Sequence, residues 1–207
     1  MEQRRNPFAK GMAVKPGPRG PGIEARDFSG RAWELLQALC ESGGLTTGAA
    51  AMAVNCSRQT ASNGMKTLWY AGMAEWYDVQ STVGMFRLWL PVEARPPRDA
   101  QEACRMAVLG LCYSLAKHEV PGFRWQLTRN GKSHAMATLE FHGQNGPERW
   151  LVDAPRTEQE PTATADLYIF PTETEAKEMT PAGKRYTTDE LLLEPGKLSE
   201  KIFWGKL

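Results

Sequence analysis

Between residues 31 and 91 the sequence contains three segments with helical spacing, followed by two segments that alternate like strands. The first helix is predicted to end at the Gly43–Gly44 pair. Thr46 can cap a short second helix of small residues, and Ser57 can cap a longer third one. The apolar and polar side chains that follow alternate with the period of two that strands require. This order of elements constrains the fold more than any single motif in the chain.

The composition is that of an ordinary globular protein. Of the 207 residues, 42% are hydrophobic and 24% are charged, which predicts a buried core and excludes wholesale disorder. A formal net charge of +1 excludes a strongly basic coat, although it leaves room for a local basic patch. No stretch is apolar enough to span a membrane, and the charged N-terminus lacks the apolar core of a secretory signal. We therefore expect a cytoplasmic protein with no membrane partner.

Changes in composition divide the chain into four segments. Residues 1–30 are rich in Pro and Gly and carry six basic against three acidic residues, which predicts a flexible basic tail. Residues 31–91 are predicted to form a first domain. Pro96–Pro97 marks a linker over residues 92–98, because proline forbids helix and stiffens the chain. Residues 99–207 are predicted to form a second domain.

The second domain is predicted to combine a long helix with an antiparallel sheet. Asp99 and Glu102 form a capping pattern ahead of the helix. The dipeptides Asn130–Gly131 and Asn145–Gly146 separate three alternating segments and predict a three-stranded meander, because tight hairpin turns favour Asn-Gly. A strand at 166–171, buried on both faces, is expected to follow. The whole chain is therefore assigned to the α+β class.

The order of elements in residues 31–91 resembles that of the winged helix-turn-helix superfamily of DNA-binding domains. The small residues at 47–51 permit the close helix crossing that this motif needs, and Ser57 stands where its recognition helix begins. The resemblance implies that helix 57–71 enters the major groove of duplex DNA with its N-terminal end first. It also implies that the two strands form a wing beside this helix.

One face of helix 57–71 carries side chains suited to DNA. Arg can address guanine and Gln or Asn can address adenine with two hydrogen bonds each, whereas Lys contacts phosphate. The expected DNA-binding residues are Arg58, Gln59, Ser62, Asn63 and Lys66, with Arg87 of the wing on the backbone. The tail residues expected to lie along backbone phosphates are Arg4, Arg5, Lys10, Lys15 and Arg19. An ordinary solvated helix face carries the same residue types, and the sequence leaves that alternative open.

The second domain resembles restriction-endonuclease-like domains in its helix, meander and further strand. Together with the first domain, it resembles the replication-relaxation proteins of plasmids and conjugative elements. Such nucleases hold a metal with an acid on the second strand and an acid-x-Lys pair on the third. Glu140 could serve as the first acid, but no lysine stands two residues after Glu148, and Glu175-Ala176-Lys177 is expected in a helix. The resemblance therefore implies a degenerate, non-catalytic domain.

We expect a non-enzymatic DNA-binding protein, an accessory or regulatory factor in transcription or replication of a plasmid, phage or conjugative element. No cofactor is expected, and no metal, because His134, Glu140 and His142 share a strand face that we interpret as solvated. The alternative is a non-catalytic adaptor or inhibitor that binds itself, as a homodimer, or another protein through aromatic surfaces of both domains. The charge balance favours the alternative, since residues 31–91 carry four basic and four acidic residues.

Overall fold

The computed structural model describes residues 6–22, 28–120, 122–129, 134–143 and 146–205. Within these ranges it is a mixed α+β fold with six α-helices and two β-sheets. The elements of the first half are β1 (Gly11–Pro16), α1 (Gly30–Ser42), β2 (Leu45–Thr46), α2 (Thr47–Ala53), α3 (Arg58–Tyr70), β3 (Ala74–Ser81) and β4 (Gly84–Pro91). Those of the second half are α4 (Ala100–Glu119), β5 (Arg124–Thr128), β6 (Met136–Gly143), β7 (Gly146–Asp153), β8 (Leu167–Phe170), α5 (Glu173–Met179), β9 (Arg185–Thr188), α6 (Asp189–Leu193), the 3-10 helix η1 (Leu198–Lys201) and β10 (Phe203–Trp204).

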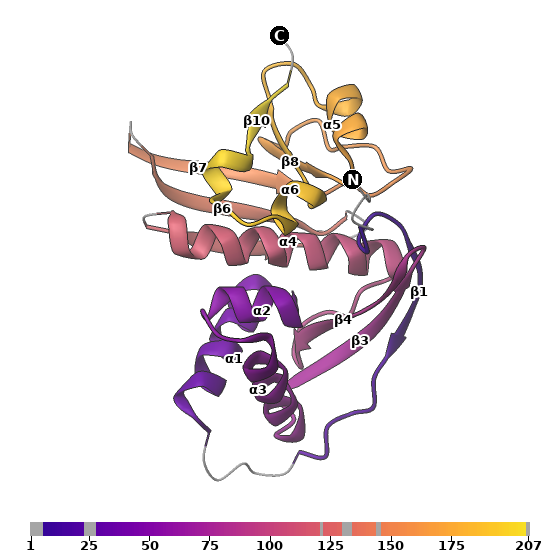
Figure 1. Ribbon diagram of the computed structural model, residues 1–207, viewed down its shortest axis with the longest axis vertical. Helices are drawn as coiled ribbons and strands as arrows, with labels where there is room; N and C mark the ends of the chain where they lie inside the picture. The colour runs from indigo at the N-terminus through magenta and orange to yellow at the C-terminus, as the bar shows by residue number, and fades with distance from the viewer. Residues whose placement is uncertain (1–5, 23–27, 121, 130–133, 144–145, 206–207) are drawn as a thin grey trace.

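Helix α4 lies at the centre of the molecule. Figure 1 shows it between the six-stranded sheet on one side and the first half, with α1–α3 and the four-stranded sheet, on the other. Most of its side chains are buried, because its sequence is apolar around the whole circumference and such a helix needs cover on all sides. One apolar core therefore runs from α1 through α4 into the second sheet. The two predicted domains share this core.

The predicted linker, residues 92–98, has neither helix nor strand, but it is tied to the second half. Arg129 donates hydrogen bonds to two carbonyl oxygens of this segment and to the carboxylate of Glu102, at 2.5 Å. Burial raises the pKa of Glu102, but hydrogen bonds from the Arg98 backbone N–H and from Arg129 outweigh it, so that pKa lies below its ordinary value. Glu102 therefore stays charged and holds both arginines.

The six-stranded sheet contains the predicted meander. β6 pairs antiparallel with β5 and with β7, in the order of the sequence. β8 then pairs parallel with β7 and with β9, and β10 pairs antiparallel with β9 at the edge of the sheet. All four residues of β8 are buried, as its apolar sequence predicts. Asn130, Gly131 and Asn145, which were expected in the two hairpin turns, lie outside the described residues.

The prediction that residues 1–30 form a flexible tail is wrong for the part that the structure describes. β1 pairs antiparallel with β3 and forms an edge of the four-stranded sheet. Three glycines of this segment, Gly11, Gly17 and Gly20, are points of close approach. A Cβ at Gly17 would overlap the indole of Trp76, and one at Gly20 would overlap the carbonyl of Trp69. The segment therefore packs on the fold, and these three glycines permit the close contact.

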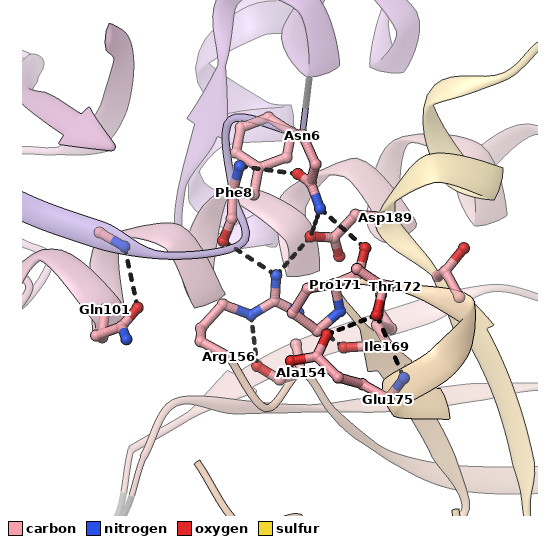
Figure 2. Close-up of polar contacts among 12 residues, drawn as sticks. Asn6, Phe8, Gln101, Ala154, Arg156, Ile169, Pro171, Thr172, Glu175 and Asp189 are labelled. Carbon is pink, nitrogen blue, oxygen red and sulfur yellow. Dashed lines mark hydrogen bonds and ion pairs between the residues drawn. The ribbon is translucent and has the colours of Figure 1, made fainter. Parts of the chain in front are cut away.

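The chain before β1, residues 6–10, crosses to the second half; we call it the N-terminal strap. Figure 2 shows Asn6 and Phe8 of the strap meeting Arg156 and Asp189. Arg156 and Asp189 form an ion pair at 2.7 Å with both side chains fully buried. Asn6 donates to the same carboxylate at 2.8 Å, and Arg156 donates to the Phe8 carbonyl at 3.2 Å. The strap therefore completes a polar cluster inside the second half.

Replacing Asp189 with Ala should lower the free energy of unfolding by about 3–5 kcal/mol, because Arg156 is then buried without a counter-charge. The matched change Lys10→Ala removes an ion pair with Glu158 whose side chains are 36% and 70% exposed, and should cost about 0–1 kcal/mol. Urea unfolding of both variants measures the difference. Equally small losses would contradict a structural role for the buried pair.

Candidate nucleic-acid interface

Helix α3 buries one face and presents the other to solvent. Its N-terminus is capped by Ser57, whose hydroxyl accepts from the Thr60 N–H at 3.0 Å. Ala61, Met65 and Leu68 are fully buried, and their spacing of four and three places them on one stripe. The orientation of α3 about its own axis is therefore fixed by its packing.

The solvent face of α3 carries the residues predicted to bind DNA. Arg58, Gln59, Asn63 and Lys66 are exposed, and Ser62 is half-buried. Gln59 Nε2 donates to Asn63 Oδ1 at 2.9 Å, so the two amides form a pair along the helix. The bond leaves the oxygen of Gln59 as an outward acceptor and the nitrogen of Asn63 as an outward donor.

A groove of about 520 Å³ separates the N-terminal half of α3 from β4. Arg58 and Ser62 line it from the helix, Arg87 lines it from β4, and Thr47 of α2 and Trp89 complete this part of the wall. The structure thus brings three of the predicted DNA-binding residues to one groove. The other three, Gln59, Asn63 and Lys66, are exposed on α3 but do not line the groove.

Arg87 is paired and stacked. Its Nε lies 2.9 Å from Asp78 Oδ1 on the neighbouring strand. Its guanidinium carbon lies 4.5 Å from the ring centroid of Trp76 and 5.7 Å from that of Trp89. Lys15 of β1 lies opposite Asp78 in the register, so this carboxylate stands between two basic residues. A phosphate approaching Arg87 must therefore compete with Asp78.

The basic residues predicted along the tail do not form one arm. Lys10 pairs with Glu158 of the second half at 2.7 Å, away from α3. Lys15 is exposed on β1, and Arg19 is exposed just beyond it. Arg4 and Arg5 lie outside the described residues. Lys15 and Arg19 are thus held by the first half itself.

The residues considered for nuclease chemistry are separated in the second half. Glu140 of β6 faces Arg149 of β7, with 3.6 Å between their charged atoms. Lys177 lies on α5, as expected, and pairs with Glu173 at 2.6 Å. In the part of the chain that the structure describes, no three His, Cys, Asp or Glu side chains are grouped closely enough to hold a metal ion.

Most aromatic residues of the hairpin and of the end of α3 are buried or half-buried. Trp89 is buried, and its Nε1 donates to Thr47 Oγ1 at 3.1 Å. Trp69, Trp76 and Trp89 follow one another at centroid distances of 4.9 and 5.2 Å. Tyr70 is the exception at 53% exposure. The aromatic cluster therefore joins α3 to the hairpin.

Sequence reasoning missed most ion pairs of the fold because their partners are distant in the chain. Arg105 with Asp153 and Arg156 with Asp189 are such pairs, both fully buried. Asp78 and Arg87 could have been paired from the sequence. Two residues separate β3 from β4, and so short a turn fixes the register of a hairpin.

Changing Ser57 to Ala should lower the free energy of unfolding by about 1 kcal/mol, because the first turn of α3 loses the acceptor for the Thr60 N–H. Ser57→Asp keeps an oxygen acceptor and should retain most of that stability. Thermal and urea unfolding measure both variants. A Ser57→Ala protein as stable as the wild type would contradict this role of the cap.

None of the helices in the described ranges combines the length and apolar character needed to cross a bilayer. No family model matches the chain, and searches of curated proteins and of solved structures find no match either. Its function is therefore inferred from the geometry of α3 and the groove beside it.

Proposed function

We propose that the chain binds duplex DNA through α3 and acts as an accessory or regulatory factor in transcription or replication. The observation that carries this proposal is the exposed polar face of α3 opposite a fully buried stripe. The succession of α1, α2, α3 and the β3–β4 hairpin supports a winged helix-turn-helix, with α3 as recognition helix and the hairpin as wing. In that arrangement α3 enters the major groove. A plasmid, phage or conjugative element as the source rests on the sequence resemblance alone.

The amide pair on α3 supplies the chemistry for reading a base. With Gln59 Nε2 bonded to Asn63 Oδ1, one acceptor and one donor face outward, four residues apart. Adenine presents a donor at N6 and an acceptor at N7 in the major groove. The two side chains together complement this edge, so we assign adenine recognition to the pair.

The groove beside α3 supplies the contacts to the DNA backbone. Arg58 and Arg87 line it from opposite sides, and Ser62 lines it from the same helix as Arg58. Phosphates pair well with guanidinium groups and hydroxyls. With Lys66, Lys15 and Arg19 on the same half, the available positive charges are few, so we expect weak binding with a modest salt dependence.

A protein-binding adaptor is the second candidate, and exposed aromatic side chains favour it. Trp33 on α1 and Tyr70 at the end of α3 are each 53% exposed. Exposed apolar patches often mark interaction sites, including contacts between two copies of one chain. Affinity capture from the native host with and without nuclease distinguishes the two functions. A stoichiometric partner that survives nuclease supports the adaptor, and defined DNA fragments support the regulator.

Asn63→Ala should change the sequence preference, by about 1–3 kcal/mol at one base pair, because it removes half of the amide pair. Lys66→Ala should weaken binding to all sequences alike and reduce the slope of log affinity against log salt by about one. Selection from a random duplex pool, followed by fluorescence anisotropy, measures both effects.

Lys177→Ala serves as the matched control for Lys66→Ala. It removes an exposed lysine from α5 in the second half and should leave DNA affinity unchanged. If wild-type protein binds neither selected nor random duplexes at low salt, the proposed function is wrong.

Asp78→Asn should raise the affinity for every duplex, because it frees the Arg87 charge while preserving the size of the side chain. The salt slope should steepen by about one, as for one added phosphate contact. Glu173→Gln releases Lys177 in the same way on α5 of the second half and should have no effect. An Asp78→Asn protein that binds like the wild type would contradict a backbone contact by Arg87.

A further inference from the structure

The second half contains a pocket of about 650 Å³ that the proposed function does not use. Leu139 and Phe141 of β6 and Trp150 of β7 form one wall, and Ile202 and Trp204 form another. Small-molecule sites are typically of about 300–1,000 Å³, mostly apolar and aromatic, with a few polar groups that fix orientation. The pocket has this character, since its remaining lining includes only a few polar side chains, namely His118, Glu119, Lys197 and Ser199.

The aromatic wall is held in place by its neighbours. The rings of Phe141 and Trp150 meet edge to face at a centroid distance of 4.8 Å. The guanidinium of Arg185 lies 4.2 Å from the Trp150 ring centroid and 4.3 Å from that of Trp204. It therefore occupies the space between two tryptophans, and its positive charge disfavours a cationic ligand. Flat apolar surface remains for a planar ring to pack against.

The polar wall offers hydrogen-bond acceptors. His118 Nε2 lies 2.9 Å from the Met52 carbonyl oxygen and 3.1 Å from that of Ala53. Both partners are acceptors, so Nε2 acts as the donor, and in that tautomer Nδ1 is an acceptor. The Glu119 carboxylate accepts from the Leu198 N–H at 2.6 Å and has lone pairs left. A ligand that donates one hydrogen bond fits this wall.

His118 also connects the pocket to the recognition helix. Its two carbonyl partners belong to the last residues of α2, and the chain then turns through residues 54–57 into α3. Asn55 in this turn has φ 48°, a left-handed conformation that Asn adopts more readily than most non-glycine residues. A molecule that moves the His118 ring therefore changes the support of the turn that precedes α3.

We propose that this pocket is an effector site for a small, neutral, planar aromatic molecule with one hydrogen-bond donor, and that its occupancy alters the α2–α3 turn through His118. Charge supports a neutral ligand, because Glu119 and Lys197 in the lining offset each other. The effect on DNA affinity rests on the proposed function, whereas binding and the response of the turn do not.

Indole and 1-methylindole, which differ in the N–H donor, are the probes for binding to the full chain by calorimetry. Indole should bind about fivefold more tightly, as expected for one net hydrogen bond. Ser199→Phe places a ring at the exposed rim and should abolish binding, whereas Thr174→Phe, on the exposed face of α5, should not change it. Absent binding of indole, equal affinities for the two probes, or unchanged binding by Ser199→Phe would each overturn the proposal.

Hydrogen exchange at the amides of residues 54–57, with and without indole, tests the connection to α3. Indole should change this exchange in the wild type and in Thr174→Phe. His118→Ala should bind indole more weakly and show no response at the turn. An equal response in His118→Ala would overturn the role of His118. If the turn responds while DNA affinity stays unchanged, the assignment of α3 as the DNA-reading helix is contradicted, and the effector site stands.

Discussion

A helix that is apolar on every side is stable only when other elements cover every side. Helix α4 is such a helix, and it lies in the middle of the fold. The four-stranded sheet and α2 cover one side, and the six-stranded sheet covers the other. Burial raises the pKa of both Cys104 and Cys112 to about 12, so their thiols remain protonated and behave as apolar side chains. The charged residues of α4 that are fully buried, Glu102 and Arg105, are each paired with an opposite charge. Each half of the molecule therefore needs α4 to complete its own core.

The same helix bears on the position of α3. Three contacts from different elements support the N-terminal end of α3, namely the Ser57 cap, the bond from Arg31 to the Val54 carbonyl, and the bonds from His118 to the end of α2. Only the first of these is local. The other two come from α1 and α4, so the orientation of the polar face depends on the packing of the whole first half against α4.

Signals that act within a few residues could be read from the sequence. The caps at Thr46, Ser57 and Asp99 are confirmed, because each side-chain oxygen accepts from the N–H three residues later. The meander and the buried strand β8 are confirmed for the same reason, since alternation and turn residues are local properties. Burial of one face of α3 likewise follows from its period.

Features that depend on distant partners could not be read. β1 is short and glycine-bearing, and nothing local shows that β3 offers it a free edge. The buried pair of Arg156 and Asp189 joins a loop to the start of α6, and neither residue signals the other. The groove beside α3 exists only once α2, α3 and β4 are packed together.

The N-terminal strap sets an order for the folding of a chain that emerges from the ribosome N-terminus first. β1 can pair as soon as β3 has been synthesised, but Asn6 meets its carboxylate partner 183 residues later in the chain. Until α6 has been synthesised, Arg156 lacks its counter-charge, and its guanidinium stays hydrated because burying an unpaired charge is costly. The residues of the strap thus finish folding among the last, and a nascent chain halted before α6 carries a first half without the Asn6–Asp189 contact that ties it to the second.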